Sequence, residues 1–461
     1  MEKRISDSAA RQLFRARLLT PQNAPASSYP PDSWRLYEDG GLLVDEYGRI
    51  RAVGEYRQIA DSNPGVRMEN LSARIIVPGF IDAHVHLPQY PAAGLYGREL
   101  LDWLDTYIFP AERRFTSAAA DSLCPVFFDR LLANGVTTAA IYSSSSAAST
   151  DKVFEWAHEK HIRAIIGKVM MDRNVPADLT DSSSKSSIAE SEKLCRKWHQ
   201  AHSDKLLYYA FTPRFAPSCS WELMRALGDH CRDAEKSRVY IQTHLSENQS
   251  EIALVKKLFP DAQDYTDVYE KAGLLGPRTL LAHAIYINAR ERNALLNAQA
   301  CLVHCPTSNL FLRSGLMPLA ELMQANHRLA LGSDVAGGPT LSPFSVMRSA
   351  IYVHNSRQFS AGKTDADVNP AAVLYLATLG GAKALGLDAI TGSLEQGKDA
   401  DFVVLDLSSF PDLPSDSQMG DLEKLLSRLV FLGDDRMVER TYVRGRVCYD
   451  RETAPAAHSP E

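Results

Sequence analysis

Val77-Pro-Gly-Phe-Ile-Asp-Ala-His-Val-His86 joins an apolar strand, a Pro-Gly break and two histidines placed two residues apart. In a β-strand, side chains two residues apart point to the same face, so both imidazoles can reach one metal ion. Zinc binds imidazole nitrogen, and a catalytic zinc keeps one coordination position open for water. The histidine pair alone is a weak signal, so the interpretation depends on what the rest of the chain supplies.

Strand-like segments begin at Ile75 and at seven later positions, and helix-like patterns separate most of them. Eight alternating units predict an α/β protein with a closed, TIM-like (β/α)8 barrel, whereas a doubly wound open sheet is the main alternative. No G-x-G-x-x-G motif follows the first strand, which disfavours the open sheet. The later strands are expected to begin at Gly135, Ile162, Leu206, Val239, Thr279, Ala300 and Arg328.

Both ends of the chain are rich in strand-like segments. We therefore predict a small β-sandwich domain built from both termini, although two unrelated additions to the barrel are an alternative. The expected division is residues 1–78 for the N-terminal part of the sandwich, 79–390 for the catalytic barrel and 391–461 for the C-terminal part. The serine-rich run 181–191 is expected to form an exposed loop.

The composition limits the kind of partner that the chain can bind. A net charge of −6 is small for 461 residues with 106 charged side chains (50 Lys and Arg, 56 Asp and Glu), which argues against nucleic acid and acidic membranes as partners. The seven cysteines are odd in number and form no C-x-x-C motif, so a reducing, cytoplasmic location is expected. The sequence contains no apolar run of about 18 residues, so no membrane span is predicted.

Metal-binding side chains stand where several of the expected strands end. The first strand ends at His84 and His86, the fifth at His244 and the sixth at His283, and the eighth runs into Asp334. In a (β/α)8 barrel, the carboxyl ends of the strands meet at one face, where the active site lies. Three or four imidazoles and one carboxylate can bind zinc or iron, so the sequence predicts a shared metal site.

Other residues near these strand ends have more than one interpretation. Asp334 could accept a proton from a metal-activated water. Glu247 follows the fifth strand and is either a proton shuttle or the first residue of a helix. Asp82 shares a strand face with the first histidine and could orient a ligand, whereas His304 is expected to be a core or strand-end histidine.

These motifs resemble those of the amidohydrolase superfamily and, over nearly the whole chain, those of its guanine deaminases. The resemblance implies a zinc-bearing (β/α)8 barrel with a β-sandwich built from both chain ends. It implies a hydrolase that converts guanine and water to xanthine and ammonia, and by analogy a homodimer. The matching stretches include Pro78–His86, His86–Tyr90, Leu101–Leu104, Phe109–Glu112, Thr212–Phe215, His244–Asn248, Tyr265–Tyr269, Cys305–Leu310 and Gly332–Gly338.

The resemblance also implies roles for individual residues, in which metal-bound hydroxide attacks the amino-bearing ring carbon while carboxylates move protons. The catalytic residues would be Glu247, Asp334 and His283. The zinc ligands would be His84, His86, His244 and Asp334, with His283 as a further ligand or a close partner of the zinc-bound water. The residues that hold the purine would be Gln89, Arg214, Phe215 and His283.

The fourth expected strand ends in Thr212-Pro-Arg-Phe215, where two-metal members of the superfamily carry a bridging lysine, so the resemblance favours one Zn²⁺ per subunit. A flat purine suits stacking on Phe215 and hydrogen bonds from Arg214 and Gln89. Without the resemblance, Arg214 would be interpreted as a salt-bridge residue and Phe215 as a packing residue. Two alternatives stay open: a superfamily deaminase or chlorohydrolase acting on another nucleobase, nucleoside or triazine, and a non-catalytic scaffold, which the complete ligand set disfavours.

Overall fold

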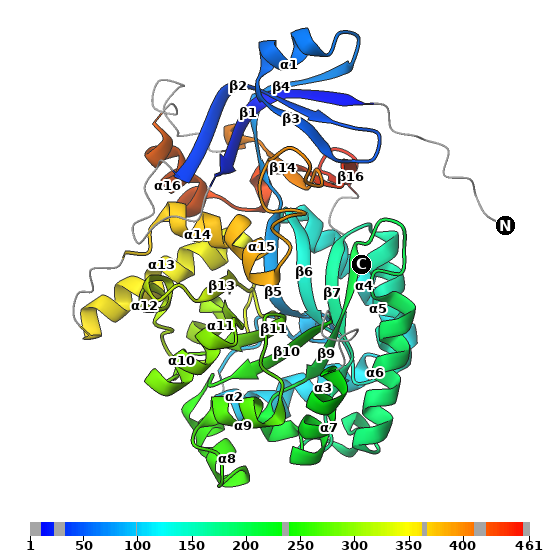
Figure 1. Cartoon of the computed structure of the whole chain (residues 1–461), viewed down its shortest axis with the longest axis vertical. Coiled ribbons are helices and arrows are strands. Elements are labelled where there is room, and N and C mark those ends of the chain that lie inside the picture. The colour runs from blue at the N-terminus through cyan, green and yellow to red at the C-terminus, as the bar shows by residue number, and fades with distance from the viewer. Residues whose placement is uncertain are drawn as a thin grey trace, which may run out of the picture.

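The computed structural model describes residues 11–22, 33–97, 99–232, 239–361, 367–409 and 421–454. Two sheets organise these residues, and Figure 1 shows the smaller, terminal sheet packed above the larger, barrel-like one. None of the helices in the described ranges is both long enough and apolar enough to span a bilayer.

Eight parallel strands form the larger sheet in chain order, which confirms the predicted barrel-type α/β fold. The first and last strands of this sheet lie close together. Two hydrogen bonds join the first strand to the turn after the last one: Asp334 N donates to His84 O over 2.8 Å, and His86 N donates to Val335 O over 2.9 Å. The strands are β5 (Phe80–His86), β6 (Val136–Tyr142), β7 (Arg163–Gly167), β9 (Leu207–Pro213), β10 (Tyr240–Leu245), β11 (Thr279–His283), β12 (Cys301–His304) and β13 (Arg328–Leu331), with the short β8 (Val169–Met170) paired to β9.

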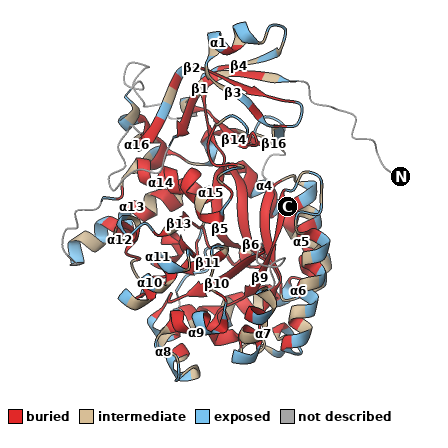
Figure 2. Ribbon diagram, viewed as in Figure 1, coloured by how far each residue is buried: buried red, intermediate tan, exposed pale blue. Residues whose placement is uncertain are grey.

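Helices cover the outside of this sheet, so its strands are buried on both faces and read as nearly continuous apolar runs. Figure 2 shows the strands as buried and the helices around them with exposed outer faces. The helices that follow β6 to β12 are α5 (Ala147–Glu159), α6 (Ser184–Trp198), α7 (Trp221–Cys231), α8 (Gln249–Leu258), α9 (Tyr265–Ala272), α10 (Ala289–Asn297), α11 (Pro306–Phe311) and α12 (Leu319–Gln324).

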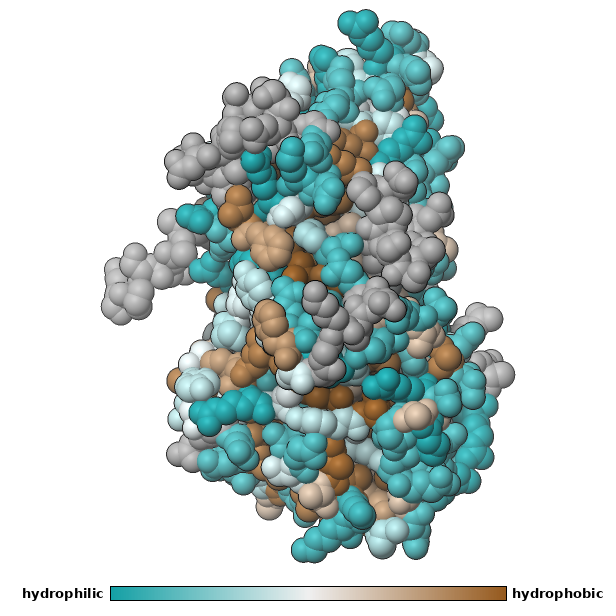
Figure 3. All heavy atoms as spheres, turned by 90° about the vertical axis from the view of Figure 1, so that its left-hand side faces the viewer, coloured by the Kyte–Doolittle hydropathy of each residue, from teal (hydrophilic) through white to brown (hydrophobic). Residues whose placement is uncertain are grey.

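The connections after the first and last barrel strands are longer than the others. After β5 come the 3₁₀ turn η2 (Leu87–Ala92), α2 (Leu100–Trp103), the π-helical turn η3 (Leu104–Ile108), α3 (Phe109–Arg114) and α4 (Ser117–Ala133). After β13 come α13 (Pro343–Ala361), α14 (Pro370–Leu376) and α15 (Leu379–Leu385), and α16 (Leu422–Leu432) follows β14. On the side of the molecule seen in Figure 3, hydrophilic residues predominate, with hydrophobic residues scattered among them.

The terminal sheet takes strands from both ends of the chain, as predicted. Its order is β16-β15-β14-β4-β1-β2-β3, and β14 pairs antiparallel with β4. The strands are β1 (Gln12–Pro21), β2 (Trp34–Val44), β3 (Ile50–Glu55), β4 (Arg67–Pro78), β14 (Phe402–Leu405), β15 (Val438–Val443) and β16 (Arg446–Asp450), with α1 (Tyr56–Ser62) beside β3. The domain limits proposed at residues 78 and 390 stay predictions, and the outermost residues, 1–10 and 455–461, lie outside the described ranges.

Two predictions about local structure are wrong. The segment that begins at Ile75 belongs to β4 of the terminal sheet, and the first barrel strand begins only after Gly79. A Cβ atom at Gly79 would lie 2.0 Å from Thr137 Oγ1, so this close crossing between the sheets requires glycine. The serine-rich run is not a loop, because α6 begins at Ser184 and the Ser183 hydroxyl accepts a hydrogen bond from Ser186 N, as helix N-caps do.

Candidate active site

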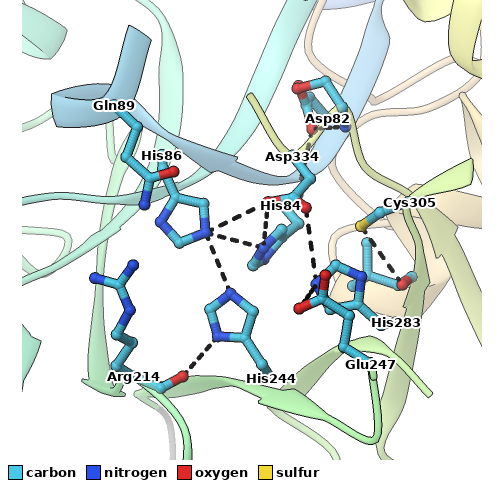
Figure 4. A network of polar contacts seen from close by, with 12 residues as sticks. Asp82, His84, His86, Gln89, Arg214, His244, Glu247, His283, Cys305 and Asp334 are labelled. Carbon is cyan, nitrogen blue, oxygen red and sulfur yellow. Dashed lines mark hydrogen bonds and ion pairs between the residues drawn. The ribbon is translucent and has the colours of Figure 1, made fainter. Parts of the chain in front are cut away.

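The predicted metal ligands converge at the carboxyl end of the barrel. His84, His244, His283 and Asp334 each offer one ligand atom, and these atoms lie within 4.8 Å of one another in a fully buried group. They come from the ends of β5, β10 and β11 and from the turn after β13, and Figure 4 shows their side chains pointing toward one centre. The structure thus places a His/His/His/Asp metal site where the sequence predicted one, but the group contains His283 and not the predicted ligand His86.

His86 stands in the same cluster. Its Nε2 lies 3.2 Å from His84 Nε2 and 3.2 Å from His244 Nε2, and 3.4 Å from Asp334 Oδ1. His84 Nε2 and Asp334 Oδ1 are 3.1 Å apart. Tetrahedral zinc with bonds of about 2.0–2.1 Å separates its ligand atoms by about 3.3–3.4 Å, so these spacings fit the edges of a zinc coordination shell.

Hydrogen bonds at the far side of two imidazoles decide which nitrogen faces the centre. His244 Nδ1 lies 2.6 Å from Arg214 O, and His283 Nδ1 lies 2.9 Å from Asn309 Oδ1. Each acceptor favours a proton on Nδ1 and leaves Nε2 as the free, metal-binding nitrogen. His283 Nε2 is buried without a hydrogen-bond partner in the described part of the chain, as a ligand atom reserved for an ion would be.

The backbone at two ligands is strained. His283 has φ +75° and Asp334 has φ +50°, in the left-handed region that side chains with a Cβ atom disfavour. Such conformations persist where the surrounding structure holds them in place, and they concentrate at functional sites.

The electrostatics of the cluster favour the forms that bind a cation. Burial, with a smaller contribution from the nearby His84 imidazole, holds the pKa values of His86 and His244 well below the ordinary value, which favours their neutral forms. Burial would raise the pKa of Asp334, but His84, His283 and His86 outweigh it and hold the pKa below its ordinary value. Neutral imidazoles and a carboxylate are the metal-binding forms of these groups.

Glu247 directs its carboxylate into the site and does not cap a helix. Asn248 is the N-cap of α8, and the Glu251 carboxylate accepts hydrogen bonds from the amides of Glu247 and Asn248. The Glu247 carboxylate instead accepts a hydrogen bond from the Ser314 hydroxyl over 3.2 Å and lies 3.4 Å from His283 Nε2. Burial, together with the nearby Asp334 charge, raises its pKa to about 8.

The residues predicted to hold the purine line the same cavity as the metal-binding cluster. Gln89 lies on η2, directly after β5, and Arg214 and Phe215 follow β9. In Figure 4, Gln89 and the Arg214 guanidinium lie on one side of the imidazoles, away from His283. Apolar side chains that sequence reasoning did not assign complete the wall, namely Leu100, Trp103, Leu104 and Leu312.

Three further residues act around the cluster and were not singled out from the sequence. Glu112 accepts hydrogen bonds from Gln89 and Arg214, while Asn309 and Ser314 contact His283 and Glu247. The sequence places Glu112 and Asn309 in stretches that resemble the family, but the resemblance implies no role for either residue.

Asp82 and His304 stand beside the cluster. The Asp82 carboxylate accepts hydrogen bonds from the hydroxyl and amide of Ser333 and from His84 N, so it joins β5 to the turn after β13 and touches no imidazole ring. His304 ends β12 outside the ligand group, and burial lowers its pKa to about 3.

Comparison with known proteins shows the family to which the chain belongs. Residues 75–448 match the amidohydrolase family. The chain is 39% identical over 424 residues to the guanine deaminase of Escherichia coli (strain K12), covering 90% of this chain and 92% of that protein. The crystal structure of guanine deaminase from Bradyrhizobium japonicum has a TM-score of 0.89 at 34% identity, covering 96% of this chain and 100% of that one. Guanine deaminase from C. acetobutylicum, with guanine bound in its active site, has a TM-score of 0.85 at 33% identity, covering 95% of this chain and 100% of that one.

Proposed function

This chain belongs to the amidohydrolase family, and we propose that it is a guanine deaminase, which hydrolyses guanine to xanthine and ammonia. One observation carries the proposal: a single cavity is lined both by the metal-binding cluster and by the hydrogen-bonding side chains of Gln89 and Arg214. The metal-binding cluster is suited to hydrolysis, and the side chains of Gln89 and Arg214 are suited to hydrogen-bonding a flat, polar base. The relatives that carry this activity match the chain over nearly its full length.

The donor set fits one zinc ion. His84, His86, His244 and Asp334 would hold it, and His283 would be a further ligand or a hydrogen-bonding partner of the zinc-bound water. When bound, zinc supplies a Lewis acid that lowers the pKa of a coordinated water to about 7. The strand β9 ends at Pro213 and is followed by Arg214 instead of a lysine, which supports one ion rather than two. Imidazole nitrogens also suit iron, so metal analysis distinguishes the two.

Two carboxylates move protons in this proposal. Glu247 lines the cavity, and its carboxylate lies 3.4 Å from His283 Nε2, within reach of water and substrate in the same space. Glu247 accepts a proton from water and delivers it to N3 of the purine, beside the amino-bearing carbon. As the water oxygen bonds to the amino-bearing carbon, Asp334 accepts the second proton of the water and passes it to the amino group. The C–N bond then breaks, ammonia leaves and the carbonyl of xanthine forms.

The opposite side of the cavity holds the base. Arg214 donates hydrogen bonds and Gln89 both donates and accepts, while the buried ring of Phe215 offers an apolar face near the His244 ring, 6.2 Å between centroids. These contacts orient the purine so that its amino-bearing carbon faces the metal-binding cluster.

A substrate panel tests the proposal. Ammonia release is measured with guanine, adenine, cytosine and a triazine, using protein whose metal content has been determined. We expect turnover of guanine alone, with about one zinc per chain. Turnover of another base would overturn the roles given to Gln89, Arg214 and Phe215, and zinc-bound protein without turnover would support the scaffold alternative.

Two further properties rest on the family resemblance and on the cysteine content. We infer a homodimer and a cytoplasmic enzyme, the latter because none of the seven cysteines forms a disulfide. Light scattering during size-exclusion chromatography measures the assembly, with a mass of about twice 51.0 kDa expected.

A further inference from the structure

Glu112 is a buried carboxylate that holds both of the polar residues on the purine side of the cavity. It lies on α3, and its side chain is 8% exposed. Glu112 Oε1 accepts a hydrogen bond from Gln89 Nε2 over 2.8 Å. Arg214 Nη1 donates to both carboxylate oxygens over 2.7 Å each, and its side chain is 4% exposed. One oxygen atom of Glu112 thus anchors both side chains.

This contact fixes which atoms of Gln89 and Arg214 remain for a ligand. A carboxylate only accepts hydrogen bonds, so the Gln89 amide must turn its NH₂ group toward Glu112, which leaves its Oε1 as a free acceptor. Arg214 uses Nη1 for Glu112 and keeps its other nitrogens as donors. Its guanidinium carbon also lies 5.4 Å from the centre of the Phe109 ring, which restricts the plane of the group.

An acceptor and a donor held next to each other match one edge of guanine. That edge carries the N1–H donor beside the C6 carbonyl acceptor, whereas the same edge of adenine has the reverse order, an acceptor at N1 and a donor at C6. A site that has to hydrogen-bond a substrate group rejects analogues that lack the group, because its buried polar atoms are then left unpaired.

We propose that Glu112 is a positioning residue that sets specificity, because it turns the Gln89 amide and the Arg214 guanidinium to accept from N1–H and donate to the C6 carbonyl. The inference rests on the proposed guanine deaminase function and adds the source of its base selectivity. Glu112 itself touches neither the metal-binding group nor, in this arrangement, the reacting carbon.

The Glu112→Gln variant tests the inference. An amide can donate as well as accept, so Gln89 becomes free to present either end and Arg214 loses its anionic partner. We expect the KM for guanine to rise by about 10- to 100-fold, with a smaller change in kcat and unchanged zinc content, because these contacts exist both before and during the reaction.

Binding of two unreactive ligands distinguishes a loss of base specificity from a general loss of folding or binding in the variant. Hypoxanthine carries N1–H and the C6 carbonyl, whereas purine carries neither, and calorimetric titration gives a Kd for each. We expect wild-type protein to prefer hypoxanthine and Glu112→Gln to lose most of that preference. Glu112→Asp keeps the buried charge but is one methylene too short to reach both partners, so it should lose part of the preference even if the amide variant folds poorly.

Glu291→Gln is the matched control, because Glu291 is also a buried carboxylate that accepts several hydrogen bonds, at the start of α10. It should keep the wild-type preference for hypoxanthine. An equal hypoxanthine preference in wild type, Glu112→Gln and Glu112→Asp would overturn the role of Glu112. Absence of guanine turnover by the wild type would instead overturn the proposed function.

Discussion

Two buried polar clusters lie at opposite ends of the barrel and differ in how their atoms are paired. At the carboxyl end, imidazole nitrogens of His84, His86 and His244 face one another at about the spacing of zinc ligands. At the amino end, Arg163 begins β7 and its Nη2 donates to Asp399 over 2.8 Å and to Asp401 over 2.9 Å. Both clusters are buried, but the second pairs a guanidinium directly with two carboxylates, whereas the first brings metal-binding atoms of like kind together.

This difference in pairing indicates that the carboxyl-end cluster serves catalysis, whereas the amino-end cluster stabilises the fold. Asp401 also accepts a hydrogen bond from the amide of Arg444, so the Arg163 cluster ties the barrel to the segments that flank the terminal sheet. In the carboxyl-end cluster, metal-binding nitrogen and oxygen atoms point at a common centre. This arrangement lowers the stability of the folded protein unless an ion or substrate binds. Substitutions at the two ends should therefore change different properties.

The largest expected effect follows from removing a metal ligand. His244→Ala should abolish zinc binding and reduce guanine turnover to background, because the Lewis acid is lost. Atomic absorption and ammonia release measure the two losses. Substantial activity in a zinc-free variant would show that the carboxyl-end cluster is not the catalytic centre.

Removing the proton shuttle should separate metal binding from turnover. Glu247→Gln should keep zinc and lose about 10²- to 10⁴-fold in kcat, because the amide no longer exchanges a proton while the ligand atoms stay in place. Metal analysis together with steady-state kinetics checks both properties. Loss of zinc from this variant would instead make Glu247 part of the metal-binding group.

At the opposite end, the expected change is in stability. Arg163→Met removes the buried guanidinium that pairs with both Asp399 and Asp401, so the free energy of unfolding should fall by about 3–5 kcal/mol. Arg49→Ala, which removes an exposed guanidinium 3.9 Å from Asp399, should cost less than about 1 kcal/mol. Urea unfolding measures both, and activity per folded molecule should be unchanged; a strong loss of kcat in folded Arg163→Met would contradict the division of roles.

The smallest expected effect concerns the partner of a ligand. Asn309→Ala removes the acceptor that orients His283, and loss of such a partner lowers metal affinity or activity by about 10- to 100-fold. Asn309→Asp keeps an acceptor oxygen at this position and should recover part of the loss. Zinc affinity is measured by competition with a chelator, and equal affinity in wild type and Asn309→Ala would show that Asn309 does not orient His283 for metal binding.

The metal site could be predicted from the sequence because the spacing of residues along a strand determines the direction in which their side chains point. His84 and His86 stand two residues apart on one strand, and His244 and His283 end neighbouring strands, so their convergence follows once the barrel is recognised. The resemblance to known enzymes added Gln89 and Arg214, whose side chains do line the same cavity.

The remaining residues could not be predicted because their contacts join segments far apart in the chain. Glu112 meets Arg214 across 102 positions, and the helix that carries it is only six residues long. The composition of the serine-rich run predicts a loop because serine disfavours helix, whereas in the structure Ser183 caps α6 and the buried Ser187 and Ser191 pack inward. Amino-acid composition alone does not show which residue caps a helix or which residues lie on its buried face.

The role of the metal is tested by titrating metal-free protein with zinc and following xanthine formation from guanine. The carboxyl-end cluster would hold one ion, which would supply the Lewis acid that activates water beside a bound purine. We predict that activity rises in proportion to added zinc and stops rising at one ion per chain. Absence of xanthine at every zinc concentration, or activity that needs two ions per chain, would contradict it.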